Sequence, residues 1–242
     1  MAGLARPRQY DCGVNLSLAE RLASVVAAVA TPFVIVGIAV LLFLNPVWVG
    51  FDQERSNVAG LTGYTPTQVR QTTGSILSDL VLGPPNFAVT VNDAPVLDAR
   101  ERGHMADVRT VLMGLGLVAL LALLLFVVVG VFGRGRRWFW RAVAIGARVT
   151  VVGVIVVGAA FAIFFDQAFT AFHEIFFGAG TYTFDPRTEK LVQLFPDQFW
   201  SETSVAISVA VLGLAVVLAL LAGRLGREVG PASPRAPAEW TP

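Results

Sequence analysis

Two histidines are the residues of this sequence whose side chains best suit acid–base chemistry. His104 stands in the run Gly-His-Met-Ala-Asp-Val and His173 in the run Ala-Phe-His-Glu-Ile-Phe-Phe, and the chain has no other histidine. Because the ordinary pKa of histidine lies near neutrality, an imidazole can take up and release protons at physiological pH. The pair is therefore the first candidate for a site. An amphipathic anchor at a membrane surface is an equally good interpretation of either residue alone.

Aromatic residues surround His173. If a helix runs through this segment, Phe169, Phe176 and Phe177 share a face with His173, since they stand four residues before it and three and four residues after it. Packing against lipid would explain the same stripe. The neighbouring carboxylate of Glu174 would favour a charged imidazole, whereas burial among aromatic rings would favour a neutral one.

Other chemistries find less support. The sequence has no Gly-x-Ser-x-Gly nucleophile motif, no Walker-type phosphate loop and no His-Glu-x-x-His metal motif. Glu101, His104 and Asp107 recur every three residues, but this spacing spreads them too far around a helix to hold one metal ion. The single cysteine, Cys12, excludes an internal disulfide. We therefore expect no metal and no other cofactor.

Composition indicates that membrane helices must position these residues. Hydrophobic residues make up 55% of the 242 positions and charged residues 14%, against about 25% charged in a soluble domain. The net charge of +1 gives no electrostatic argument for nucleic acid as a partner. We interpret the chain as a small integral membrane protein.

Four stretches are apolar enough to cross a bilayer, which takes about 20 residues. Their expected bounds are 21–44, 110–133, 142–165 and 203–223. The third span requires Arg148 to extend its charged end to the membrane surface. The first span is too long for the apolar part of a signal peptide, so we expect it to be retained.

Charge orients these spans. The connection 134–141 holds four arginines and no acid, which places it in the cytoplasm by the positive-inside rule. Both ends of the chain, 1–20 and 224–242, then lie in the cytoplasm, and we expect the second of them to be a disordered tail. The connections 45–109 and 166–202 are net negative and are assigned to the outside, where both histidines then lie near the membrane surface.

The two outer connections are too long for simple turns and predict a small cap. Thr65 followed by proline is typical of a helix start, and apolar spacing predicts a helix over 67–82. The β-forming run 87–91 ends at an Asn-Asp turn signal, and 190–195 predicts a strand or a short helix. The expected fold class is an all-α membrane protein of four transmembrane helices with a small mixed α/β extracellular cap.

Together, the two histidine segments resemble the DUF1461 family of membrane proteins, which includes lipoprotein intramolecular transacylases. The resemblance rests on His-Met-Ala-Asp-Val at 104–108 and Phe-His-Glu-Ile-Phe-Phe at 172–177. It continues through Phe-Asp-Pro at 184–186 and Phe-Trp at 199–200, and the four-span topology matches. The sequence departs from the family pattern at Tyr182, where tryptophan is common.

The resemblance implies an activity and its partners. Such an enzyme moves the sn-2 acyl chain of a diacylglyceryl lipoprotein from the glycerol oxygen to the α-amino group of the N-terminal cysteine. The reaction takes place at the outer face of the bacterial cytoplasmic membrane. The expected partners are therefore diacylglyceryl lipoproteins and membrane lipids.

The resemblance also implies the site residues. His104 and His173 become the catalytic pair, acting as general acid and base, with the assignment of the two roles left open. The substrate-binding residues expected around them are Phe172, Phe176, Phe177, Tyr182, Trp200 and Asp107.

Two alternatives remain open at this point. One is a non-enzymatic four-span scaffold or accessory protein, in which substitution of the histidines would change nothing. The other is a metal-dependent interfacial hydrolase or transferase that acts on another lipid, which a chelator would inhibit.

Overall fold

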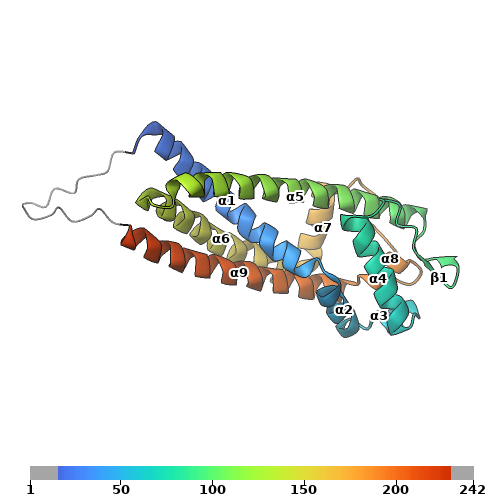
Figure 1. The fold of residues 1–242 in the computed structure, drawn as a ribbon. Helices are drawn as coiled ribbons and strands as arrows, with labels where there is room; N and C mark the ends of the chain where they lie inside the picture. Colours follow the sequence, from blue (N-terminus) through green and yellow to red (C-terminus); the bar gives the residue numbers. More distant parts are fainter. Residues whose placement is uncertain (1–15, 230–242) are drawn as a thin grey trace, which may run out of the picture.

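Four long helices dominate the fold (Figure 1). A computed structural model describes residues 16–229. In order along the chain its elements are α1 (Leu18–Phe43), α2 (Pro46–Arg55), α3 (Val58–Thr62), α4 (Pro66–Val81), β1 (Thr90–Val91), β2 (Ala94–Pro95), α5 (Ala99–Gly133), α6 (Arg137–Ile163), α7 (Phe165–Phe176), α8 (Lys190–Leu194) and α9 (Asp197–Glu228). The helices α1, α5, α6 and α9 are each long and apolar enough to cross a membrane, which confirms the four predicted apolar helices.

The long helices extend beyond the apolar stretches. α5 begins at Ala99 rather than near Thr110, because Asp98 and Glu101 form a reciprocal capping box that starts the helix there. At 1.5 Å per residue α5 is about 52 Å long, more than the roughly 30 Å hydrocarbon core of a bilayer. Because its charged residues are concentrated in the first turns, which also carry His104, we expect these turns to project past the membrane. α9 likewise continues to Glu228, so the beginning of the 224–242 segment that was expected to be disordered is helical. The rest of that segment lies outside the described residues, as does Cys12 near the other end of the chain.

Small residues bring the long helices together. A Cβ on Gly146 of α6 would lie 2.4 Å from the carbonyl oxygen of Ala28 on α1. A Cβ on Gly37 of α1 would lie 2.8 Å from the Cβ of Ala119 on α5. Close approach over small residues is how membrane helices gain packing energy when lipid is as apolar as their side chains. Many leucines and valines of α5 point outward and stay exposed, as expected for a surface that faces lipid.

Replacing Gly146 with valine should destabilise the bundle by about 1–3 kcal/mol, the usual range for overpacking. The new side chain would meet the backbone of α1, which cannot move aside without separating the two helices. Thermal unfolding in detergent measures the effect. Gly153→Val on the same helix is the matched control, since a Cβ there meets nothing within 4 Å. Equal melting temperatures for the two variants would refute this account of the packing.

The cap region, made of α2, α3, α4, β1, β2 and α8, lies at one end of the bundle (Figure 1). The predicted helix over 67–82 is α4, which starts at a Thr65 capping box. The predicted strand is shorter than expected, because only Thr90 and Val91 pair across a turn at Asn92 and Asp93. Both turn residues have positive φ, which asparagine and aspartate tolerate best after glycine. The side of the membrane on which this region lies stays a prediction.

The cap region has its own hydrophobic core. Among its fully buried side chains are Phe87, Ile76, Leu97 and Leu194. Buried polar bonds add to it, since Gln53 on α2 donates to the carbonyl oxygen of Leu194 at 2.8 Å. The core therefore fixes the start of α5 against α4 and α8.

Candidate functional site

The two histidines lie next to each other. His104 is in the first turns of α5 and His173 is on α7. Their ring centroids are 6.0 Å apart and their planes differ by 22°. The side chains are 7% and 9% exposed. The fold thus places two residues that are distant in sequence within a single buried pair.

Aromatic rings cover this pair. Phe177 touches both histidines, with centroid distances of 4.8 Å to His104 and 5.3 Å to His173. Tyr182 lies 5.1 Å from the His173 ring, and Phe172 packs edge-on against it at 5.5 Å. The spacing in the sequence predicts Phe177 on the His173 face of a continuous helix. In the structure α7 ends at Phe176, and Phe177 contacts the histidines from an extended backbone conformation.

Three further residues expected at the site lie at its edge. Phe176 packs on Phe172 at 4.9 Å and is 41% exposed. Trp200 meets Phe169 at 6.2 Å rather than either histidine in the described aromatic contacts. Asp107 is exposed, and its negative charge acts on His104 by favouring the protonated ring. Their role in binding a substrate stays a prediction.

Two aromatic residues of the site were not among the expected substrate contacts. The Phe169 ring lies 4.2 Å from that of His173, and its position four residues earlier on the helix was the signal for it. Phe184 lies 5.4 Å from the His104 ring. Phe184 belongs to the connection after α7. No sequence pattern in that connection predicts that it packs against α5.

The hydrogen bond of His173 defines which of its nitrogens is free. Its Nδ1 lies 2.8 Å from the carbonyl oxygen of Phe169. A carbonyl oxygen only accepts, so Nδ1 carries the proton and Nε2 of the neutral ring keeps a free lone pair. Glu174, the carboxylate next to His173 in sequence, is exposed. The backbone of α7 orients the imidazole.

His104 is held neutral. Burial lowers its pKa from the ordinary value of 6.5 to about 4, the nearby His173 adds to this effect, and the charge of Asp107 opposes it. Its Nδ1 is buried without a hydrogen-bond partner among the described residues. Unpaired buried polar atoms are uncommon in proteins and call for a functional or structural reason.

We predict that His104 stays uncharged until the pH falls to about 4. Because the chain has only two histidines, ¹⁵N-histidine NMR in detergent micelles should resolve both rings, with His104→Gln assigning them. The free energy of unfolding should also fall as the pH drops from 6.5 towards 4, because the unfolded ring binds a proton there and the folded ring does not. Titration of His104 near 6.5 would contradict the prediction.

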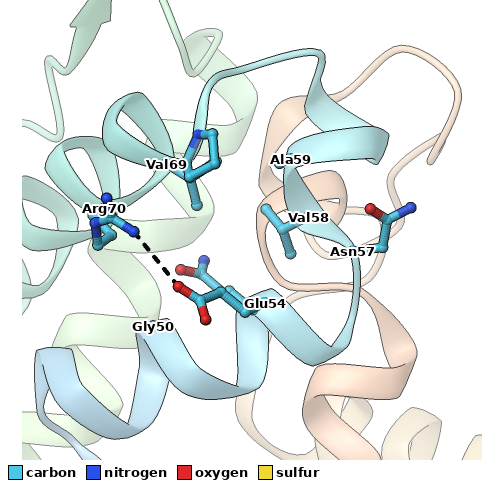
Figure 2. A pocket seen from close by; sticks show the side chains of 9 residues that line it. Gly50, Glu54, Asn57, Val58, Ala59, Val69 and Arg70 are labelled. Atoms are coloured by element: carbon cyan, nitrogen blue, oxygen red, sulfur yellow. Dashed lines mark hydrogen bonds and ion pairs between the residues drawn. The ribbon is translucent and has the colours of Figure 1, made fainter.

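Residues that could hold a metal are not gathered at the pair. Between residues 16 and 229, no group of three or more His, Cys, Asp or Glu side chains has a suitable arrangement. A separate pocket lies between α2, α3 and α4 (Figure 2) and is lined by Gly50, Gln53, Glu54, Asn57, Val58, Ala59, Pro66, Val69 and Arg70. Neither histidine lines it, and Arg70 lies 3.5 Å from Glu54 within it.

These features define a class: an integral membrane protein with four apolar helices and a buried histidine pair at one end of the bundle. The sequence model of lipoprotein intramolecular transacylase Lit matches residues 25–200. The chain therefore belongs to the Lit family. No curated protein matches it in sequence.

Solved structures share the fold. The lipoprotein intramolecular transacylase Lit from Bacillus cereus superimposes with a TM-score of 0.75 at 20% identity, over 87% of this chain and 97% of that one. Variants of that protein with one histidine replaced by arginine or by alanine give TM-scores of 0.71 and 0.72, again at 20% identity. They match 87% of this chain and 93% and 94% of theirs.

Proposed function

We propose that this protein is a lipoprotein intramolecular transacylase that moves an acyl chain from the glycerol oxygen to the N-terminal amine of a diacylglyceryl lipoprotein. The observation that carries the proposal is the buried pair of His104 and His173 under an aromatic cover. Membership of the Lit family supports the reaction class. The substrate supplies both the nucleophile and the ester, so the protein needs groups that move protons and hold the two ends together.

His173 is proposed as the group that moves the proton. The α-amino group has an ordinary pKa of about 7.7–8.0, so its ammonium form first releases one proton to water, and the neutral amine then attacks with a second proton still to lose. As the amine nitrogen bonds to the ester carbonyl carbon, the free Nε2 of His173 takes the proton from that nitrogen. The same proton then passes to the glycerol oxygen as its bond to carbon breaks, so the ring ends as it began. The bond from Nδ1 to Phe169 favours the tautomer that this step requires.

His104 is proposed as the group that stabilises the developing negative charge. A neutral imidazole donates a hydrogen bond without giving up its proton, as suits a ring with a pKa of about 4. Its buried Nδ1 has no partner among the described residues, so an oxygen of the tetrahedral intermediate can supply one. A donor aimed at such an oxygen is worth about 100- to 1,000-fold in rate.

The place of the pair suits a lipid substrate. It lies where α5 leaves its apolar stretch, so the acyl chains can stay in the bilayer while the glycerol and the amine reach the histidines. Exposed Asp107 is positioned to attract the ammonium group before it loses its proton. We assign the site to the outer face of the bacterial cytoplasmic membrane from the charges of the connections.

Mass spectrometry of lipoprotein N-termini tests the proposal. A bacterial host without its own lipoprotein N-acylation would express the chain, and its lipopeptides would be compared with those of the empty host. We expect one acyl chain to appear on the cysteine nitrogen at unchanged total mass. Products lighter by one acyl chain would indicate a hydrolase instead, and unchanged diacylglyceryl lipopeptides would refute the proposal.

A further inference from the structure

One segment of the chain closes over the histidines. Residues 181–191, here termed the strap, form most of the connection after α7 and continue into the first turn of α8. Tyr182 of the strap packs on His173 and Phe184 packs on His104, at centroid distances of 5.1 Å and 5.4 Å. The strap is largely without regular secondary structure, so contacts from other elements must set its position.

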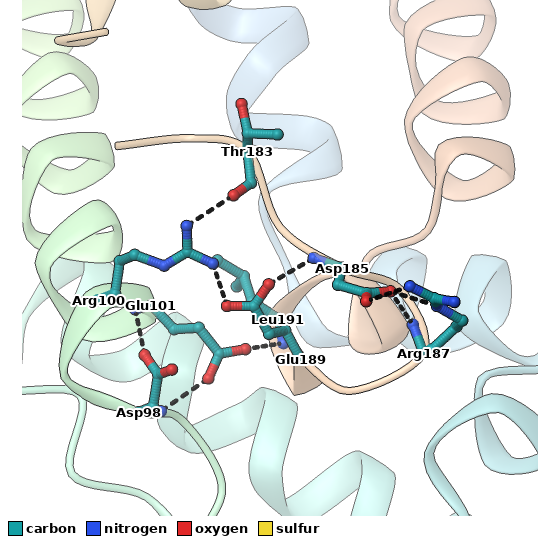
Figure 3. Close-up of polar contacts among 8 residues, drawn as sticks. All are labelled: Asp98, Arg100, Glu101, Thr183, Asp185, Arg187, Glu189 and Leu191. Atoms are coloured by element: carbon teal, nitrogen blue, oxygen red, sulfur yellow. Dashed lines mark hydrogen bonds and ion pairs between the residues drawn. The ribbon is translucent and has the colours of Figure 1, made fainter. Parts of the chain in front are cut away.

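Arg100 of α5 holds the strap at three points, and Figure 3 shows its contacts with Thr183 and Glu189. Its Nη1 donates to the carbonyl oxygen of Thr183 at 2.9 Å, and its Nη2 forms an ion pair with Glu189. Its guanidinium carbon lies 4.7 Å from the centroid of the Phe184 ring. Glu189 also accepts a hydrogen bond from the backbone nitrogen of Asp185, so this side chain links two residues of the strap to each other.

Glu101, the next residue, fixes the far end of the strap. It is 2% exposed, and its Oε1 accepts from the backbone nitrogen of Leu191 at 2.7 Å. Its Oε2 accepts from the backbone nitrogen of Asp98 at 2.7 Å, within the capping box that starts α5. His104 follows three residues later on the same helix. A single turn of α5 therefore positions both its own histidine and the cover above it.

We propose that Arg100 is a positioning residue that acts through Phe184 and the strap to seal the histidine pair from water. The proposal rests on the function proposed above, since it assigns Arg100 to the site where that reaction would occur. Only arginine can make all three contacts, because its planar fork reaches a carbonyl and a carboxylate at once and stacks on a ring. Lysine would keep the charge and lose this geometry.

The titration of His104 reports the seal independently of activity. Its pKa is lowered to about 4 chiefly by burial, so water admitted by a loose strap should raise it. Other charges also act on this ring. His173 lowers its pKa and Asp107 raises it. The other charged or titratable groups on the elements packed around it are Arg100, Glu101, Arg102 and Arg109 in the first turns of α5, Asp166 and Glu174 of α7, and Tyr182, Asp185, Arg187, Glu189 and Lys190 of the strap.

The test compares Arg100→Lys and Arg100→Gln by ¹⁵N-histidine NMR of the full chain in micelles. We expect the pKa of His104 to rise by about one unit or more in both variants. Arg102→Lys and Arg102→Gln are the matched controls, because Arg102 lies on the same turn and bonds to Asp98 rather than to the strap. Their His104 pKa should stay at the wild-type value.

Each outcome decides the proposal. A rise in Arg100→Gln alone would attribute the effect to charge and overturn the proposal, as would no rise in either variant. If the Gln variant fails to fold, Phe184→Leu replaces it, since this change opens the cover with Arg100 intact and should raise the pKa as well.

A kinetic measurement separates this inference from the function itself. With a diacylglyceryl lipopeptide as substrate, Arg100→Lys should lower kcat by about 10- to 100-fold, because the reacting groups lose their alignment. A wild-type protein that forms no N-acyl product would refute the proposed function, while the NMR titration would still decide whether Arg100 seals the pair.

Discussion

Replacing His173 with glutamine should lower the rate of acyl transfer by about 100- to 10,000-fold, the usual contribution of a general base. Glutamine has a similar size and can still donate to the carbonyl oxygen of Phe169, but it cannot take up a proton from the amine. The fold should survive, because the ring lies in an aromatic cluster at the edge of the bundle rather than within its helix packing. The effect is therefore expected on kcat.

The measurement is the initial rate of N-acyl lipopeptide formation by purified protein in lipid bilayers. Glu174→Gln is the matched control, since this neighbour is exposed and carries no role in the proposed step. Its rate should remain within a factor of about two of wild type, in the range of ordinary surface substitutions. A rate for His173→Gln close to that of Glu174→Gln would remove His173 from the mechanism.

The second large effect concerns His104. His104→Phe should lower the rate by about 100- to 1,000-fold, because phenylalanine fills the aromatic site and removes the donor to the developing oxyanion. His104→Gln should retain more activity than the phenylalanine variant, since its amide still donates a hydrogen bond. This order of rates distinguishes a hydrogen-bond donor from a general base. If His104 were a base, both variants would lose activity equally, because neither glutamine nor phenylalanine can accept the proton.

The same assay measures both variants, and a nearby packing change provides the control. Met105→Leu alters the buried residue next to His104 with little change in volume, so it should cost little stability and little rate. Equal losses in the phenylalanine and glutamine variants would contradict the donor role. A loss in Met105→Leu as large as in either would point to packing rather than to the imidazole.

The membrane helices could be predicted from sequence because lipid imposes a simple rule. About 20 apolar residues in a row have few stable alternatives to a spanning helix. Most of each expected stretch does lie in α1, α5, α6 or α9, although the third stretch runs past the end of α6 at Ile163. The ends of those helices were less predictable, since local caps decide them. The capping box of Asp98 and Glu101 moves the start of α5 to Ala99, well before the apolar stretch expected at 110–133.

The site could be predicted only in part. Topology alone placed His104 and His173 in one layer, but their contact depends on how α5 and α7 pack, which no periodicity encodes. Phe177 and Phe184 reach the pair through irregular backbone, at a helix end and in the strap. The unprotonated nitrogen of His173 is identified by one hydrogen bond, from Nδ1 to the carbonyl oxygen of Phe169. That bond depends on the side-chain rotamer of His173, which the sequence does not specify.

A crossover experiment tests the central claim most directly. Purified protein would receive two diacylglyceryl lipopeptides of different peptide sequence, one of them deuterated in its sn-2 chain, and tandem mass spectrometry would locate each acyl group. We expect each peptide to carry its own sn-2 chain on the cysteine nitrogen, and His173→Gln to form both products at least about 100-fold more slowly. Exchange of labelled chains between the peptides, release of free fatty acid, or full activity in His173→Gln would contradict the claim.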